Sequence, residues 1–142
     1  MTLSAPHRLL LVDDDEPFRL SLARAMERRG FHVFAAATPA EAVALAQEAE
    51  PDFAVVDLRL GEGNGLDLVP LLTRLVPHIR IVMLTGYGNI ASAVSAIKAG
   101  AVDFLPKPVE ADGLKAVLLG ENKEVVEIPE APMTPERLRW EY

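Results

Sequence analysis

The chain has 142 residues, the length of a single domain, and half of them are hydrophobic, so it can bury a core and is not disordered throughout. With 14 basic and 21 acidic residues the net charge is −7, which argues against a nucleic-acid or anionic-membrane surface on these residues. There is no cysteine, which excludes a disulfide framework, a thiolate nucleophile and cysteine-ligated zinc.

Short apolar runs recur along the chain and predict five buried strands. These runs cover residues 8–12, 31–36, 53–56, 80–84 and 102–105. The stretches between them have helical spacing and predict helices over residues 18–29, 39–49, 66–76, 90–99 and 111–119. The first apolar run is too short for a signal peptide, and no run is long enough to cross a membrane, so we expect a cytoplasmic protein.

Local signals support these boundaries. Thr38 and Glu41 have the spacing of a capping box, and Gly30 and Gly100 stand where helices are expected to end. Pro70 lies inside the third predicted helix, where it would remove a backbone donor. We therefore expect that helix to begin one residue before Pro70 or to be kinked.

Strict alternation of strands and helices predicts an α/β fold, a doubly wound five-stranded parallel sheet with helices on both faces. The pattern alone does not determine the order of the strands. In such a sheet, ligands bind beyond the carboxyl ends of the strands. The residues that follow each apolar run are therefore the candidates for a functional site.

Polar residues gather at four of these strand ends: Asp13 and Asp14, then Asp57, then Thr85, then Lys107. Each one alone has an ordinary explanation, as a helix cap, a turn residue or a solvated lysine. Together, however, converging carboxylates repel one another unless a cation neutralises them. Oxygen ligands without histidine or cysteine favour Mg²⁺, which in turn indicates phosphoryl chemistry.

Four motifs resemble the receiver domain of bacterial two-component response regulators over residues 8–119. They are LLVDDD at 10–15, VVDL at 55–58, MLTG at 83–86 and DFLPKP at 103–108. The resemblance implies the strand order 2-1-3-4-5, which is that of the chemotaxis receiver. Residues 58–67 and 84–94 are similar in particular to the redox-responding RegA/PrrA/ActR group.

The resemblance implies a role for each acidic residue. Asp57 is then the phosphoacceptor, Asp14 a direct Mg²⁺ ligand, Asp13 a partner of the ion through water, and the backbone carbonyl of Arg59 a further ligand. Many receivers carry proline where this chain has Gly61, which predicts a looser loop after Asp57.

The resemblance also implies how the phosphoryl group is held and sensed. Thr85 and Lys107 would bind its oxygens, and Phe104 would act with Thr85 as an aromatic switch. The peptide bond between Lys107 and Pro108 is expected to be cis, as is usual in this family. Asp15 matches no ligand role and is expected to be a cap or an outer group.

We therefore expect a sensor histidine kinase to phosphorylate Asp57 in an Mg²⁺-dependent reaction that switches the protein rather than turning over a metabolite. Phosphorylation would promote a homodimer through the face of the fourth helix, fifth strand and fifth helix. Its apolar contacts could come from Ile97, Leu114, Val117 and Leu118, although a place in the core explains these residues equally well.

The predicted receiver domain covers residues 8–120, followed by a linker over 121–133 that is rich in proline and glutamate. Residues 132–141 resemble the stretch that leads into a Fis-type helix-turn-helix in the RegA/PrrA/ActR group. Residues 134–142 are thus expected to be the start of a truncated C-terminal DNA-binding region. Any contact with DNA would come through that absent domain, to control transcription.

A phosphatase of the haloacid dehalogenase type is an alternative, because it also uses an aspartyl nucleophile, Mg²⁺, a hydroxyl and a lysine. Its nucleophile stands in an Asp-x-Asp motif on the first strand, which Asp13 and Asp15 match. This alternative gives Asp57 no task, and the chain has no segment long enough to close over a substrate.

Overall fold

A computed structural model gives the fold of the chain and describes residues 7–61, 63–86 and 90–120. In chain order the elements are β1 (His7–Val12), α1 (Glu16–Glu27), β2 (Phe31–Ala36), α2 (Pro39–Ala49), β3 (Phe53–Asp57), β4 (Arg59–Leu60), β5 (Gly63–Asn64), a 3₁₀ turn (Gly65–Asp67), α3 (Leu68–Leu75), β6 (Arg80–Thr85), α4 (Ile90–Ala99), β7 (Asp103–Pro106) and α5 (Ala111–Leu119). The linker and the DNA-binding region expected after residue 120 lie outside the described residues.

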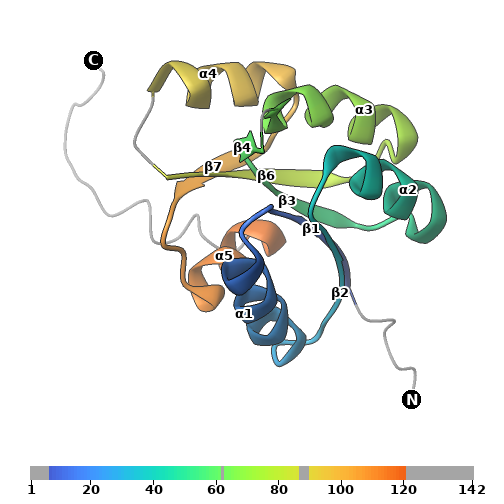
Figure 1. Cartoon of the computed structure of the whole chain (residues 1–142), viewed down its shortest axis with the longest axis vertical. Helices are drawn as coiled ribbons and strands as arrows, with labels where there is room; N and C mark the ends of the chain where they lie inside the picture. The colour runs from blue at the N-terminus through green and yellow to red at the C-terminus, as the bar shows by residue number, and fades with distance from the viewer. Residues whose placement is uncertain (1–6, 62, 87–89, 121–142) are drawn as a thin grey trace, which may run out of the picture.

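The five long strands form one parallel sheet in the order β2-β1-β3-β6-β7 (Figure 1). Counting only these strands along the chain, the order is 2-1-3-4-5, as the family resemblance implied. The strands β4 and β5 form a separate antiparallel pair. This hairpin was not predicted from the sequence.

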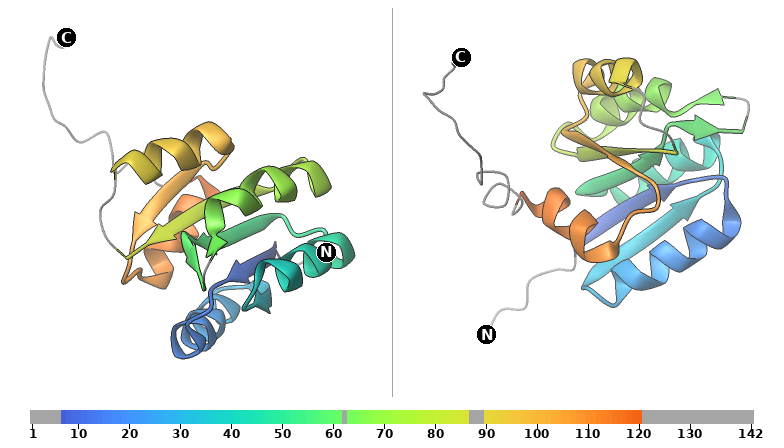
Figure 2. Two further views of the ribbon diagram at one scale, coloured as in Figure 1. Left: turned by 45° about the horizontal axis from the view of Figure 1, so that its top comes forward. Right: turned by 90° about the vertical axis from the view of Figure 1, so that its left-hand side faces the viewer.

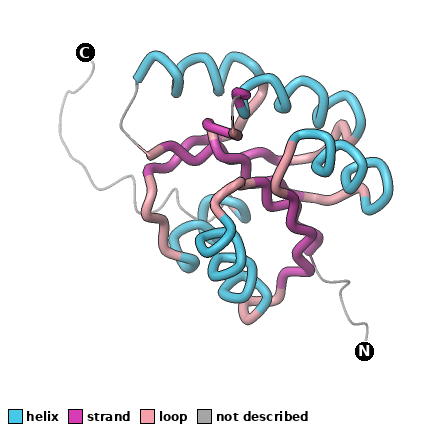
Figure 3. The backbone as a smooth tube through the Cα atoms, viewed as in Figure 1, coloured by secondary structure: helices cyan, strands magenta, loops and turns pink. Residues whose placement is uncertain are grey.

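Helices cover both faces of the sheet, with α2, α3 and α4 on one side and α1 and α5 on the other (Figures 1 and 2). The smooth trace in Figure 3 shows the strands as the middle layer between them. None of the helices in the described ranges has the length and apolar character needed to span a membrane. The predicted doubly wound α/β architecture is confirmed.

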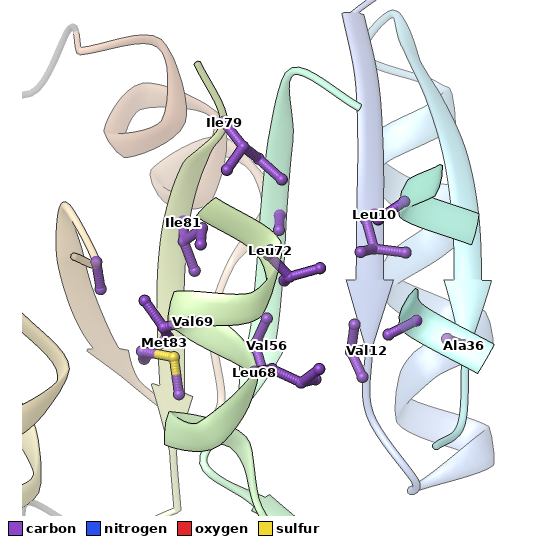
Figure 4. Packing of buried hydrophobic residues seen from close by; sticks show 14 of the residues in the cluster. Leu10, Val12, Ala36, Val56, Leu68, Val69, Leu72, Ile79, Ile81 and Met83 are labelled. Atoms are coloured by element: carbon purple, nitrogen blue, oxygen red, sulfur yellow. The ribbon is translucent and has the colours of Figure 1, made fainter. Parts of the chain in front are cut away.

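Two hydrophobic clusters fill the space between the layers. The α2–α4 cluster contains Leu10, Val56 and Met83 with side chains of α3, and the α1/α5 cluster contains Leu11 and Val55 with side chains of α1 and α5. Figure 4 shows α3 lying over β3 and β6 in the first of these clusters. Successive strand residues alternate between the clusters because side chains of a strand point to opposite faces.

The ends of the helices largely follow the predicted signals. The Thr38 hydroxyl accepts the N–H of Glu41 at 3.2 Å, while the Glu41 carboxylate accepts the N–H of Ala37 at 2.8 Å. Gly30 and Gly100 have φ values of 96° and 122°, which few other residues adopt.

Pro70 does not kink α3, because the helix begins at Leu68 and Pro70 falls in its first turn. Backbone N–H groups of a first turn have no partner within the helix, so proline costs no hydrogen bond there. The first of the two sequence-based alternatives is therefore correct to within one residue.

Gly65 lies where the chain turns from the hairpin into α3 and touches the end of β3. Its N–H donates to the carbonyl of Leu58 at 2.7 Å. A Cβ atom at this position would overlap the backbone carbonyl of Asp57. The hairpin is thus packed directly against the residue that the sequence singled out as phosphoacceptor.

We predict that Gly65→Ala lowers the free energy of unfolding by about 1–3 kcal/mol, because the added methyl forces two backbone segments apart. The matched control is Gly113→Ala within α5, where a Cβ meets no atom within 4 Å. Alanine should raise stability there by about 0.5–1 kcal/mol. Urea denaturation of the three proteins checks both signs, and a neutral effect of Gly65→Ala would contradict the tight contact.

Candidate functional site

Three carboxylates converge at the carboxyl end of the sheet. Asp13 and Asp14 follow β1, Asp57 ends β3, and these neighbouring strands pair Val12 with Val56. Each carboxylate offers an oxygen, and these oxygens all lie within 4.8 Å of one another. Asp13 is fully buried and Asp57 is 7% exposed, whereas Asp14 is exposed. The structure therefore brings together the three acids that the sequence placed at one edge.

Backbone N–H groups from the surrounding loops orient these carboxylates. Oδ1 of Asp13 accepts the N–H of Asp15 at 2.9 Å, and Oδ2 of Asp14 accepts the N–H of Gly61 at 2.7 Å. Oδ1 of Asp57 accepts the N–H of Arg59 at 3.3 Å, a long bond. Each acid therefore keeps an oxygen that no backbone N–H occupies in these contacts.

Lys107 directly follows β7, and its side chain reaches the carboxylates at the ends of β1 and β3. Its backbone N–H donates to the carbonyl of Thr85 at 2.8 Å, continuing the pairing of β6 and β7. Its ammonium lies 2.9 Å from Oδ2 of Asp13 and 3.2 Å from Oδ2 of Asp57. The peptide bond to Pro108 is cis, as expected.

The charges in this pocket do not balance, because three carboxylates lie together and the single ammonium of Lys107 contacts two of them. Burial, followed by repulsion from Asp13, raises the pKa of Asp57, and the attraction of Lys107 only partly opposes this. Burial acts against the charge of Lys107, but its contacts with Asp13 and Asp57 outweigh burial and raise its pKa. The site thus favours a further positive charge.

One oxygen in particular suits a cation. Oδ2 of Asp13 is a buried anionic oxygen whose partner is the Lys107 ammonium at 2.9 Å. That ammonium is shared with Asp57, so it neutralises Oδ2 of Asp13 only in part. Together with the hard-oxygen donor set, this fits a magnesium-type ion.

The other predicted site residues lie beside this pocket. Thr85 ends β6 and is 6% exposed. Phe104, in β7, is half-buried and packs against the α2–α4 cluster. Arg59 follows the end of β3 and its side chain is exposed, while the role of its carbonyl stays a prediction.

Two contacts of the site were not foreseen. The N–H of Gly61, beside the β4–β5 pair, donates a hydrogen bond to Asp14, and the expectation of a looser loop after Asp57 stays a prediction. The Phe18 ring centroid lies 4.3 Å from the Lys107 ammonium, a cation–π contact. Phe18 stands in the first turn of α1, where the Asp15 carboxylate accepts its N–H at 3.2 Å, and no local sequence signal pointed to its contact with Lys107.

The expected dimer face is only partly exposed. Leu114, Val117 and Leu118 are buried in the α1/α5 cluster, so they belong to the core. Ile97 is 47% exposed on α4. Of the four apolar residues named from sequence, only Ile97 is available for a contact at the surface.

Comparison with known proteins is consistent with this geometry. Residues 9–119 match the response regulator receiver domain family. The chain is 52% identical over 140 residues to the photosynthetic apparatus regulatory protein RegA of Cereibacter sphaeroides, covering 99% of this chain and 76% of RegA. It is 51% identical over 134 residues to the acid tolerance regulatory protein ActR of Sinorhizobium medicae, covering 94% of this chain and 69% of ActR.

Solved structures agree. A response regulator from Burkholderia pseudomallei with a phosphorylated aspartic acid, calcium ion and citrate has a TM-score of 0.78 and 41% identity, over 87% of this chain and 75% of that one. The beryllofluoride-activated NtrC4 receiver domain dimer has a TM-score of 0.74 and 31% identity, over 82% and 97%. The chain belongs to the response regulator receiver domain family, and the phosphatase alternative is not supported.

The raised pKa of Asp57 has a consequence for stability. A carboxyl whose pKa rises on folding stabilises the fold below its ordinary pKa of about 4, and this contribution is lost as the pH rises through the folded value. Without added metal at pH 7, Asp57→Asn should therefore be more stable than the unaltered protein, by up to about 1 kcal/mol. The advantage should shrink as the pH is lowered.

Urea denaturation in EDTA at several pH values measures this difference. Asp112→Asn is the control, since hydrogen bonding to Arg29 lowers the pKa of Asp112 and its loss should bring no gain. If Asp57→Asn is less stable than the unaltered protein at pH 7, the attraction of Lys107 for the Asp57 carboxylate outweighs its burial and its repulsion by Asp13, which would contradict the raised pKa.

Proposed function

We propose that this receiver accepts a phosphoryl group on Asp57 from a sensor histidine kinase in an Mg²⁺-dependent reaction. The observation that carries the proposal is the placement of the Asp57 carboxylate between the Lys107 ammonium and two further carboxylates. Family membership supports it, as does the related Burkholderia response regulator, which is described with a phosphorylated aspartic acid.

In this proposal Asp13, Asp14, Asp57 and the carbonyl of Arg59 hold the ion, with Asp13 acting through water. An Mg²⁺ ion held there would neutralise charge on the phosphoryl oxygens. A carboxylate oxygen of Asp57 attacks phosphorus in line with the leaving group. Lys107 supplies a positive charge to the same phosphoryl group.

Phosphorylation then acts as a switch. Thr85 would bind a phosphoryl oxygen. The Phe104 ring would then move with the Thr85 side chain and alter the face formed by α4, β7 and α5. Formation of a homodimer through that face is part of the proposal, and the NtrC4 relative is described as an activated receiver dimer. Ile97 on α4 is an exposed apolar contact for it.

The output proposed for this switch is control of transcription. The regulatory relatives RegA and ActR support this, and the chain spans about three quarters of RegA. In the proposed organisation, residues 8–120 receive the signal, 121–133 connect, and 134–142 begin a DNA-binding region.

Intact-mass analysis after incubation with acetyl phosphate and Mg²⁺ tests the phosphoacceptor. We expect one phosphoryl adduct that is absent with EDTA and absent in Asp57→Ala. The matched control is Asp67→Ala, which removes an acid whose side chain makes no capping hydrogen bond and should leave the adduct unchanged. An adduct that persists in Asp57→Ala would move the acceptor to another carboxylate and refute the assignment.

Mg²⁺ binding is tested separately from phosphorylation. Because a ligand stabilises the state that binds it, millimolar Mg²⁺ should raise the melting temperature by roughly 2–8 °C. Asp14→Asn should abolish most of this rise, whereas Asp67→Asn should retain it. An equal rise in all three proteins would show that the ion binds outside the acidic pocket.

A further inference from the structure

The ammonium of Lys107 has partners of two kinds. The carboxylates of Asp13 and Asp57 lie at 2.9 and 3.2 Å, and the face of Phe18 lies at 4.3 Å from the ring centroid. The Lys107 side chain is 20% exposed, so little water completes its shell. An ammonium over an aromatic face is attracted by the ring quadrupole, and more strongly when it is partly desolvated.

The two carboxylates change partners during the proposed reaction. Asp57 would become an acyl phosphate and lose its negative carboxylate, and Asp13 is proposed to act on the ion through water. The ion pair of Lys107 with Asp57 would then give way to a contact with a phosphoryl oxygen. Among these three side-chain partners within the described residues, the Phe18 ring alone carries no charge and undergoes no chemistry.

The Phe18 ring is held in place by its own surroundings. It stands in the first turn of α1, where the carboxylate of Asp15 accepts its backbone N–H at 3.2 Å. Arg19, the next residue, donates from its guanidinium to the carbonyl of Asp13 at 2.8 Å. The ring is half-buried and packs against the α1/α5 cluster, which contains Leu22. The start of α1 is thereby tied to the acidic pocket at two points.

We propose that Phe18 is a positioning residue that keeps the Lys107 ammonium in the pocket through a cation–π contact while its carboxylate partners change. This inference rests on the proposed function. In the step concerned, a bond forms between an Asp57 carboxylate oxygen and phosphorus. The bond from phosphorus to the acyl oxygen of the donor breaks, and acetate leaves with the electron pair when acetyl phosphate is the donor.

The test replaces Phe18, by site-specific incorporation, with phenylalanines carrying one, two and three ring fluorines. Fluorination weakens the ring quadrupole stepwise and changes its size little. We expect the rate of Asp57 phosphorylation by acetyl phosphate at saturating Mg²⁺ to fall with each fluorine, by roughly three- to tenfold over the series. The phosphorylation rate of Phe18→Leu should fall at least as far, and Phe18→Trp should keep most of the rate of the unaltered protein.

The control is the same fluorine series at Phe34, a half-buried ring in β2 that stacks on His32 and packs against the α2–α4 cluster, on the opposite face of the sheet from Phe18. The rate of Asp57 phosphorylation should stay constant across the Phe34 series. A rate that stays constant across the Phe18 series would overturn the proposal and leave Phe18 as a packing residue.

A second measurement does not depend on phosphorylation. The ring current of Phe18 should shift the ε-methylene protons of Lys107 upfield, and Phe18→Leu should remove this shift. Absence of the shift in the unaltered protein would overturn the contact itself. If the shift is present but no phosphoryl adduct forms, the proposed function fails while the contact stands, so the two failures are distinguishable.

Discussion

Charge repulsion at the carboxyl end of the sheet is the constraint on which the site depends. Parallel pairing of β1 with β3 places Asp13 and Asp57 side by side, and the adjoining Asp14 adds a third carboxylate. Within the described residues of this pocket the single ammonium of Lys107 contacts two of the carboxylates, and the burial of Asp13 and Asp57 limits the screening of their charges by water. A fold that places three carboxylates together in this way favours the binding of a cation, and a bound cation can in turn neutralise a charged phosphoryl group.

Much of this site was predictable because strand ends in a parallel sheet share an edge. The apolar runs located the strands, and the residues after them identified Asp13, Asp57, Thr85 and Lys107 without any knowledge of strand order. The order itself required the resemblance, since alternation of strands and helices is compatible with several windings. Asp15 was foreseen as a cap, and it caps α1.

The features that the sequence did not predict depend on contacts between distant segments. Each strand of the β4–β5 hairpin has two residues, which is too short for a periodic signal, and the sequence indicated only a looser loop at Gly61. The hydrogen bond from Gly61 to Asp14 joins residues 47 positions apart. Phe18 fits the apolar pattern of α1 equally well as a core residue, so no local signal revealed its contact with Lys107.

The pleat of the sheet divides the site between two layers. Asp57 follows the alternation of Phe53 and Val55, and Lys107 that of Leu105, all on the α1/α5 side. Thr85 follows the alternation of Ile81 and Met83 on the α2–α4 side, and Phe104 packs against the cluster that contains these two residues. Of the two proposed phosphoryl ligands, Thr85 therefore lies on the same side of the sheet as Phe104, and Lys107 lies on the other side with Asp57. In the proposed switch Thr85 would carry the change from one side of the sheet to the other, so the helices on the two faces could present separate surfaces.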